Sequence, residues 1–382
     1  MSAAASLAVS ALVALTACGG GSSAGGSGGD SKTLNVLTWE TYHDQAALDK
    51  FTEETGIKVN AVNAASADEM YAKVKSSPTQ WDLALVTAGW FDNYAKADLL
   101  EPIDESKVTS MKDIKLDFDW RGAASSDDKL YGVLYNWGNQ PLAWMGDIPD
   151  GVDPKYLDSE GKPADWNILW DPAFKGKVSV FDDPTSVLPM IALSLGIKDP
   201  YNLDEAQYAQ VKEKLMALRP QLKRLTSGFN DQTDQFASGE ATMGYLNNIA
   251  SVPTLKKTGK TLNVNNIIET GVPAWSDNYA ITKQGGAKKL DSVYKFINYT
   301  QSTEWQAEFI KNSGNNGTLD YTQATSPEAR KAGLTKEVVS GTLIPSTREG
   351  DKFFSKMLFF QPVEDQGKRV ELWNEFKLGI GS

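Results

Sequence analysis

The chain has 382 residues, of which 41% are hydrophobic and 23% are charged, so it is long enough to form two globular units with separate cores. It has 38 Lys and Arg against 49 Asp and Glu, and this net charge of −11 has the wrong sign for a nucleic-acid partner. One Cys and one His exclude a disulfide framework and a Cys- or His-rich zinc site. We therefore expect no metal site and no cofactor.

The first 17 residues contain no charged side chain, and their apolar run is shorter than the roughly 20 residues of a membrane-spanning helix. This pattern predicts an export signal over 1–17. The segment 15–18, Leu-Thr-Ala-Cys, resembles the lipobox of bacterial lipoproteins, in which the Cys is lipidated and becomes the mature N-terminus. Residues 18–32 are rich in Gly and Ser, which predicts a flexible tether. We expect an exported protein in the periplasm or on the outer cell surface, attached to the membrane only through a lipid on Cys18.

From Thr33 the sequence alternates between strand-like and helix-like segments. Expected strands cover 34–38, 57–61 and 82–86; one helix lies between an Asp44 N-cap and a Gly56 stop, and another follows a Ser66–Glu69 capping box. This order predicts a sheet with helices on both faces and ligand sites at the carboxyl ends of its strands. Residues 39–42 and 87–90 are therefore expected at one rim.

Beyond residue 137 the chain becomes rich in Pro and Gly, and a second α/β set follows. We expect strands over 177–181, 244–246 and 279–281, and helices over 187–195, 204–218 and 290–297.

Aromatic and acidic residues recur together at the ends of the expected strands. Trp39 adjoins Glu40 and Tyr42, Trp275 stands two residues before Asp277, and the pair 182–183 is Asp-Asp at the end of a strand. A carboxylate between aromatic ring faces suits a desolvated organic ammonium, because the ring attracts the cation and the carboxylate accepts a charge-assisted hydrogen bond. The pattern predicts a cationic ligand.

Several segments in order also show a resemblance to a known family. They are 37–42, 51–59, 70–73, 81–83, 166–176, 182–183, 239–244 and 275–277. Together they resemble the spermidine/putrescine-binding component of ATP-binding-cassette (ABC) importers, an extracellular solute-binding family.

This resemblance implies an α/β, two-lobed type II periplasmic-binding-protein fold, in which each lobe is a mixed sheet flanked by helices. The expected first lobe is 33–136 plus 276–312, and the second is 137–275 plus 313–382. Crossover hinge strands near 135–141 and 271–275 join them. The protein is expected to be a monomer that delivers its solute to membrane permease subunits.

The resemblance also implies a ligand site, carried over position by position. Trp39 and Tyr42 would line the wall of the first lobe, Asp183 would contact an amino group from the second, and Trp275 and Asp277 would meet another nitrogen of the ligand. Gln361 lies where the family places a terminal amide. The positions that differ from the family pattern complete the candidate site. Glu40 stands where the family often has a small hydroxyl residue, and Trp90, after Gly89, stands where it has an aromatic pair. Ser186 replaces an acid of the family, and Asn247 replaces a Trp.

The expected function is capture of a small organic cation, a polyamine or a diamine such as spermidine or putrescine. Loss of the acid at Ser186 favours a shorter or less charged amine, with Glu40 as a candidate substitute acid. The alternative is a binding protein for a sugar, an amino-acid derivative or a ferric ion on the same fold, because sugar sites also stack Trp rings and use Asp as an acceptor.

Catalysis is not expected. Adjacent side chains on a strand point to opposite faces, so Asp182 and Asp183 would not flank one bond. Outside the Gly/Ser tether the sequence contains no G-x-S-x-G elbow, and it contains no Walker motif. The single histidine, His43, is interpreted as a solvated residue at the rim.

Overall fold

The computed structural model describes residues 32–380, so the predicted signal peptide, the lipidation site Cys18 and nearly all of the tether lie outside the described residues. Within them, the larger of two main sheets has seven strands, with β13-β12-β3-β1-β2 in order and β4 and β7 also paired to β12. These strands are β1 Thr33–Thr38, β2 Lys58–Asn63, β3 Leu83–Thr87, β4 Leu100–Glu101, β7 Gly132–Asn139, β12 Val272–Thr282 and β13 Met357–Phe359.

The smaller sheet has the order β11-β8-β10-β9. Its strands are β8 Leu142–Met145, β9 Val178–Ser179, β10 Met243–Tyr245 and β11 Leu262–Asn265, and a short hairpin is formed by β5 Ser125–Ser126 and β6 Lys129–Leu130. Both main sheets combine parallel and antiparallel pairs: β1 runs parallel to β3 while β12 is antiparallel to it, and β10 is parallel to β9 and antiparallel to β8.

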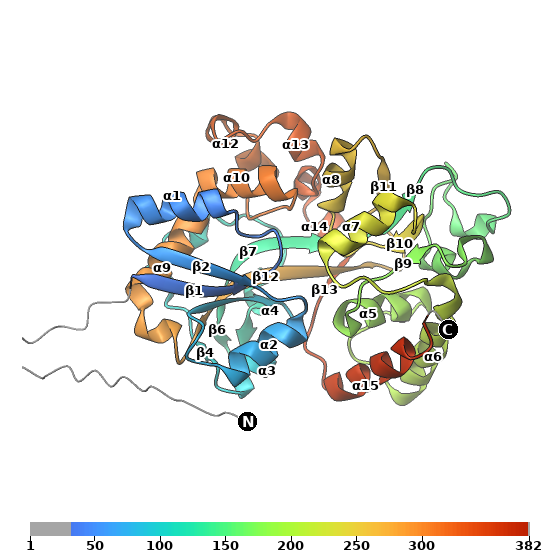
Figure 1. The fold of residues 1–382 in the computed structure, drawn as a ribbon, viewed down its shortest axis with the longest axis horizontal. Helices are drawn as coiled ribbons and strands as arrows, with labels where there is room; N and C mark the ends of the chain where they lie inside the picture. Colours follow the sequence, from blue (N-terminus) through green and yellow to red (C-terminus); the bar gives the residue numbers. More distant parts are fainter. Residues whose placement is uncertain (1–31, 381–382) are drawn as a thin grey trace, which may run out of the picture.

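Helices cover both sheets, and the molecule has two halves side by side (Figure 1). Around the larger sheet lie α1 Gln45–Thr55, α2 Ala67–Ser76, α3 Phe91–Lys96, α4 Trp120–Ala123, α9 Leu290–Thr300 and α10 Thr303–Ser313. The other half contains α5 Pro184–Ser194, α6 Glu205–Met216, α7 Phe229–Ser238, α8 Ser251–Lys257 and, near the C-terminus, α15 Gln366–Lys377.

The remaining helices are short. They are α11 Tyr321–Ala324, α12 Pro327–Lys331, α13 Lys336–Ser340 and α14 Asp351–Phe354. Short 3-10 helices are η1 Glu105–Lys107, η2 Met111–Asp113, η3 Pro154–Tyr156, η4 Trp166–Trp170, η5 Pro172–Phe174, η6 Arg219–Gln221, η7 Gly286–Lys288 and η8 Ile344–Glu349.

Local sequence signals explain where the first helices begin and end. The Asp44 carboxylate accepts a 2.9 Å hydrogen bond from the Ala46 amide at the start of α1, and Gly56 ends the helix at φ 70°, a conformation that glycine adopts without strain. At α2, Ser66 caps the amide of Glu69 at 3.2 Å, and the Glu69 carboxylate turns back to the Ala65 amide at 2.7 Å. Both predicted helices are confirmed.

The strand expected over 177–181 is shorter than predicted. β9 covers only Val178–Ser179, and Phe181 makes an isolated bridge to Thr226. The chain turns out of the sheet at this point because Asp183 is the N-cap residue of α5, with Pro184 as the first helical residue.

Two long strands connect the halves. β7 and β12 pair antiparallel and run through the centre of the molecule (Figure 1), and their register shifts at Asp277, where a bulge interrupts the ladder. Val272 of β12 packs in the hydrophobic cluster of the smaller sheet, whereas Trp275 packs in the cluster of the larger one. Both segments predicted as hinges lie on this strand pair.

The lobe boundaries stay a prediction. Side chains between Leu319 and Phe354 pack in the hydrophobic cluster of the larger sheet, while Trp373 and Phe376 of α15 pack in the cluster of the smaller sheet. The segment after β13 is therefore a further connection between the halves, in addition to β7 and β12.

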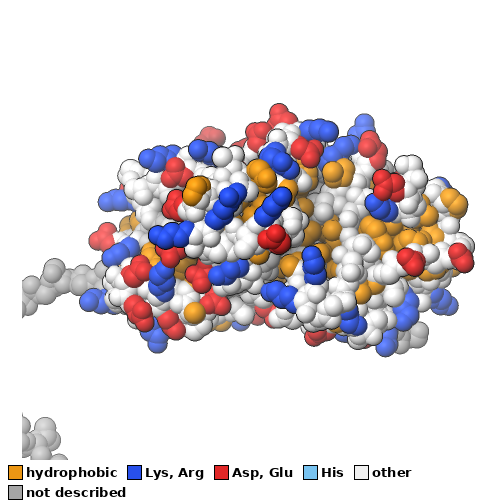
Figure 2. All heavy atoms as spheres, turned by 90° about the horizontal axis from the view of Figure 1, so that it is seen from above, with side chains coloured by type: hydrophobic (Ala, Val, Ile, Leu, Met, Phe, Trp, Pro, Cys, Tyr) orange, Lys and Arg blue, Asp and Glu red, His pale blue; other side chains and the backbone are white. Residues whose placement is uncertain are grey.

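The face shown in Figure 2 has Lys and Arg side chains interspersed with Asp and Glu, and hydrophobic side chains gather on the half that contains the smaller sheet.

Candidate functional site

A cavity between the two halves, here called the inner cavity, collects aromatic and acidic side chains from both. Its empty volume, which includes space open to solvent, is about 460 Å³. The lining residues are Trp39, Tyr42, Ala67, Thr87, Gln140, Phe181, Asp183, Thr185, Phe229, Asn247, Trp275, Asp277 and Phe360. Strand ends of the larger sheet form one wall, and the first turns of α5 and α7 form the other.

Asp277 is a buried carboxylate in the middle of β12. Its Oδ2 accepts a 2.7 Å hydrogen bond from the Tyr42 hydroxyl, and its Oδ1 accepts one of 2.5 Å from the Thr87 hydroxyl. Burial raises the pKa of Asp277 to about 7, although these two hydrogen bonds oppose the shift. The site therefore fixes this carboxylate in position without neutralising its charge.

Asp183 is the second buried carboxylate of the inner cavity and comes from the other half. It caps α5, where its Oδ1 accepts a 2.9 Å hydrogen bond from the Thr185 amide. Burial raises the pKa of Asp183 to about 7; the amide of Thr185 opposes the shift, and the neighbouring charges of Asp68 and Asp182 add to it.

Neither carboxylate has a cationic partner of its own. Among residues 32–380, no Lys, Arg or His nitrogen lies within 4.0 Å of Asp183 or Asp277, whereas the buried Asp82 is paired with Lys289 at 2.9 Å. A buried carboxylate without a counter-charge is costly, so both groups favour either a proton or a cation from outside the protein.

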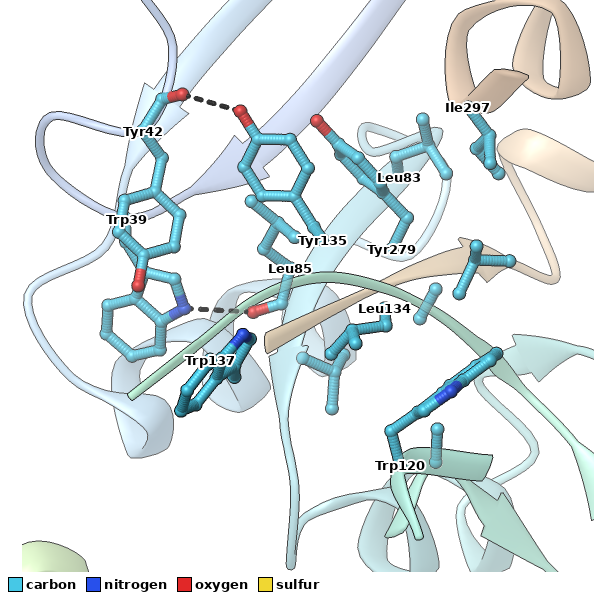
Figure 3. Close-up of a cluster of buried hydrophobic side chains, with 14 of the residues drawn as sticks. Trp39, Tyr42, Leu83, Leu85, Trp120, Leu134, Tyr135, Trp137, Tyr279 and Ile297 are labelled. Carbon is cyan, nitrogen blue, oxygen red and sulfur yellow. Dashed lines mark hydrogen bonds between the residues drawn. The ribbon is translucent and has the colours of Figure 1, made fainter. Parts of the chain in front are cut away.

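Aromatic side chains shape the wall between these acids. The Trp39 indole donates a 3.1 Å hydrogen bond to the Leu85 carbonyl, and Tyr42 lies beside it, with its backbone carbonyl accepting from the Tyr135 hydroxyl at 3.0 Å (Figure 3). Trp275 packs against Gly138, where an added Cβ would lie 2.6 Å from the indole Cζ2. The Trp39 ring is held by a backbone carbonyl, the Tyr42 ring by its hydroxyl on Asp277, and Trp275 by packing on Gly138, so these rings have little conformational freedom left to lose when a ligand binds.

A polar network supports the Asn247 side of the cavity. Gln140 donates to Asn247 Oδ1 and accepts from the Tyr245 hydroxyl, which also donates to the Ser186 carbonyl at 2.9 Å. The backbone amide of Asn247 donates a 2.8 Å hydrogen bond to the side-chain oxygen of Gln232. Asn247, at the position where the family pattern has Trp, is thus oriented by buried hydrogen bonds.

The inner cavity brings together a subset of the sequence-predicted site residues: Trp39, Tyr42, Asp183, Asn247, Trp275 and Asp277. Their ligand-binding role stays a prediction. Trp39 and Tyr42 follow β1, Asp277 lies on β12 opposite Thr87 at the end of β3, and Asp183 and Asn247 come from the other half.

The other predicted residues lie elsewhere. Glu40 lines an adjoining larger cavity, and Trp90 and Gln361 line a separate small one. Trp90 is the N-cap residue of α3, and its ring packs on that of Tyr71 with the centroids 5.8 Å apart. Ser186 is buried behind the cavity wall, and its Oγ has no hydrogen-bond partner in the described part of the chain. Glu40 and Gln361 lie outside the helices and strands, so no alternation of faces sets the direction of their side chains.

Sequence reasoning missed Thr87, Gln140 and Phe229. Thr87 ends β3 within the segment 87–90, which the sequence places at the rim. The sequence predicts this position but does not predict the contact of Thr87 with Asp277. Phe229 is the first residue of α7, and no local signal distinguishes it from a core residue.

His43 corrects a further expectation. It is partly buried rather than solvated: its Nε2 lies 2.7 Å from the Tyr279 hydroxyl, its Nδ1 lies 2.9 Å from the Thr38 hydroxyl, and its ring stacks on Tyr135 at an interplanar angle of 2°. Burial lowers the pKa of His43 to about 3, so the imidazole is neutral and packs against aromatic side chains of the core.

Within residues 32–380, no group of three His, Cys, Asp or Glu side chains is arranged to hold a metal ion. In the same range, no helix has both the length and the apolar character needed to cross a bilayer.

Comparisons with known proteins agree with this geometry. Residues 46–332 match the family described as bacterial extracellular solute-binding protein, and the chain belongs to this family. It is 30% identical over 269 residues to spermidine/putrescine-binding periplasmic protein 1 of Haemophilus influenzae, covering 70% of each chain. It is also 30% identical over 275 residues to the spermidine/putrescine-binding periplasmic protein of Escherichia coli, covering 71% of this chain and 73% of the relative.

A solved structure shows the same fold. A spermidine/putrescine ABC transporter substrate-binding protein from Streptococcus pneumoniae superposes with a TM-score of 0.65 at 23% identity, covering 91% of this chain and 99% of that one. The family resemblance, the periplasmic-binding-protein fold and the solute-binding role predicted from the sequence are confirmed. Because the family is extracellular, the chain is an exported solute-binding protein.

Proposed function

We propose that this protein captures a small organic dication, a diamine or polyamine, in the inner cavity and delivers it to the permease of an ABC importer. The relatives named for spermidine and putrescine support this ligand class. The observation on which the proposal depends is a pair of buried carboxylates, Asp183 and Asp277, that face one aromatic cavity from opposite halves and have no Lys or Arg partner within residues 32–380.

The chemistry of the two ends suits an α,ω-diamine. One ammonium group would bind Asp277 beside Trp39 and Trp275, and the other would bind Asp183 at the N-terminus of α5. Each ammonium gains a charge-assisted hydrogen bond, and a ring face adds roughly 0.5–2 kcal/mol of cation–π attraction. A micromolar dissociation constant corresponds to about −8.2 kcal/mol, which these contacts can supply while the two halves remain able to reopen.

The test is a thermal-shift screen of the protein without its tether, using putrescine, spermidine, amino acids and sugars. A ligand that binds only the folded state raises the melting temperature by mass action. We expect the amines to stabilise the protein and the neutral sugars to leave it unchanged. Stabilisation by a sugar or an amino acid and by no amine would refute the proposal.

We also propose that the mature protein is attached to the membrane through a lipid on Cys18, and that its globular part is a monomer. The lipobox-like segment ending at Cys18 and the Gly/Ser tether after it support the lipid anchor. In cells, Cys18→Ala should move the protein from the membrane fraction to the soluble fraction. Continued membrane attachment of this variant would exclude a lipid on Cys18. Light scattering should give the mass of one chain for the globular part, and a dimer mass would exclude the monomer.

A further inference from the structure

The first turn of α7 contacts both halves of the molecule. The helix belongs to the half with the smaller sheet, yet Phe229, its first residue, packs on the hydrophobic cluster of the larger sheet. The next residue, Asn230, donates a 2.6 Å hydrogen bond from its side-chain amide to Oε1 of Glu40, which lies just beyond the end of β1 in the larger sheet. Both contacts require the two halves to lie close together.

The N-terminus of α7 has no capping side chain of its own. Its N-cap residue is Gly228, which cannot accept hydrogen bonds from the first amides of the helix. By contrast, α2 and α5 are capped by the side chains of Ser66 and Asp183. Asp231 lies in the first turn of α7, but its carboxylate is paired with Arg224 at 2.8 Å. The positive end of the α7 dipole is therefore available to another carboxylate.

Glu40 supplies such a carboxylate from the opposite half. Its Oε2 lies beside the helix start, where a Cβ added to Gly228 would stand 3.2 Å from this oxygen, while its Oε1 accepts from Asn230. No Lys, Arg or His nitrogen lies within 4.0 Å of the Glu40 carboxylate anywhere in residues 32–380. A carboxylate without a cationic partner is stabilised by the partial positive charge at a helix N-terminus.

We propose that Glu40 and the first turn of α7 form a closing latch, in which a carboxylate of one half caps a helix of the other half when the two halves close. This inference concerns the regulation of the proposed binding site and rests on the proposed function. The latch stabilises the closed state whatever ligand lies inside, so it slows ligand release. This role differs from the substitute acid for a ligand that the sequence predicts at Glu40.

The experiment is a double-mutant cycle on ligand release, using the parent, Glu40→Ala, Asn230→Ala and the double variant. Stopped-flow fluorescence with putrescine gives the association and dissociation rate constants, because Trp39 and Trp275 line the inner cavity and report its occupation. We expect Glu40→Ala to raise the dissociation rate about fivefold and to leave the association rate within about twofold, since closure follows binding. Asn230→Ala should raise the dissociation rate at least about twofold in the parent and leave it unchanged when Glu40 is already absent.

A second ligand and a control variant separate a latch from a direct ligand contact. Spermidine has one more charge than putrescine, and Glu40→Ala should accelerate the release of both by the same factor, because a latch acts on the protein and not on the ligand. Glu69→Ala is the control: this acid lines the same adjoining cavity but pairs with Lys73 of its own helix at 3.1 Å. It should leave both release rates unchanged. The melting temperature of each variant without ligand verifies that it is folded.

An unchanged dissociation rate in Glu40→Ala would overturn the latch. A full effect of Asn230→Ala in the Glu40→Ala background would also overturn it, because the two residues would then act independently. A larger acceleration for spermidine than for putrescine would show instead that Glu40 contacts the ligand directly. A parent that binds neither amine would refute the proposed function alone. The same cycle would then be measured with the compound that the thermal-shift screen identifies, and its coupling would decide for or against the latch.

Discussion

The Tyr42 hydroxyl donates a 2.7 Å hydrogen bond to Asp277 Oδ2, and the two residues are 235 positions apart in the chain. Thr87 donates to the other carboxylate oxygen, so one group that follows β1 and one that ends β3 fix a buried carboxylate in the middle of β12. Its two protein hydrogen bonds orient it but leave its negative charge for a partner from outside. This preorganisation lowers the cost of binding a cation.

Replacing Asp277 with Asn should remove most amine binding. The neutral amide has nearly the same shape but cannot pair with an ammonium, and leaving that buried cation unpaired costs about 3 kcal/mol, or roughly a 100-fold loss of affinity. Titration calorimetry with putrescine measures the change. Asp182→Asn is the matched control, because Asp182 accepts from the Trp373 indole at 2.6 Å and does not line the inner cavity. An Asp277→Asn affinity within threefold of the parent would contradict the assignment.

Amine binding should strengthen as the pH rises through 7. Burial raises the pKa of both Asp183 and Asp277 to about 7, so much of each group is protonated and neutral at pH 6 in the unliganded protein. An ammonium ligand favours the ionised form, and binding therefore releases protons. Between pH 6 and pH 8 we expect roughly a tenfold gain in affinity for each carboxylate that must ionise. Calorimetry in two buffers of different ionisation enthalpy measures the protons released, and an affinity that is flat from pH 6 to pH 8 would contradict this prediction.

The same two groups should make the unliganded protein less stable as the pH rises. Their ordinary pKa is 3.8, and in the folded protein it is about 7. Between these values the folded state keeps protons that the unfolded state has released, so the contribution of these groups to the free energy of unfolding falls from pH 4 to pH 7 and then levels off. Urea unfolding of the parent and of the double variant Asp183→Asn/Asp277→Asn isolates this contribution. The double variant should show a shallower fall, and equal slopes would disagree with the two raised pKa values.

Tyr42→Phe should change the pH at which the site binds. The Tyr42 hydroxyl donates to the ionised carboxylate and so lowers the pKa of Asp277 against the effect of burial. Without that donor the pKa of Asp277 rises further, and we expect putrescine affinity to fall about tenfold at pH 7 and to recover most of this loss at pH 9. A loss of equal size at both pH values would show instead that the hydroxyl acts only through packing.

Gly138→Ala should disturb the aromatic wall without touching either acid. The added Cβ would lie 2.6 Å from Cζ2 of Trp275, so the indole has to move in a tightly packed environment, at a cost of about 1–3 kcal/mol in the free energy of unfolding. We expect a lower melting temperature and weaker amine binding. Gly367→Ala is the control: it lies in α15 with no atom within 4 Å of its added Cβ, and alanine should stabilise that helix by about 1 kcal/mol. Equal melting temperatures for the two variants would contradict this reading of the Trp275 contact.

The start of the fold was predictable because its signals are local. Asp44, Gly56 and Ser66 mark helix ends by hydrogen bonds within a few residues of themselves, and these residues have the predicted roles in the structure. The strand near Val178 was predicted too long because its end is not set by a local signal. An apolar run indicates burial, but the helix that begins after Asp183 takes the chain out of the sheet.

The candidate site was predictable only in part. The rim position of Trp39 follows from the end of β1, which the alternation of strands and helices indicates, whereas Asp277 reaches the same cavity because the middle of β12 pairs with the end of β3 at Thr87. The separate locations of Glu40 and Trp90 depend on the direction of individual side chains after a strand ends, and the sequence has no periodic signal there. His43 was misread because its partners, Tyr135 and Tyr279, come from distant strands.

One titration tests the central claim most directly: putrescine against 1,4-butanediol, calorimetrically, at pH 8 and fixed ionic strength. The two ligands have the same four-carbon chain and differ in whether their ends are charged. If Asp183 and Asp277 bind two ammonium groups, putrescine binds with a dissociation constant on the order of micromolar, and the diol shows no binding at millimolar concentration. Binding of the diol as tightly as the diamine, or no heat from putrescine, would contradict this assignment of the cavity.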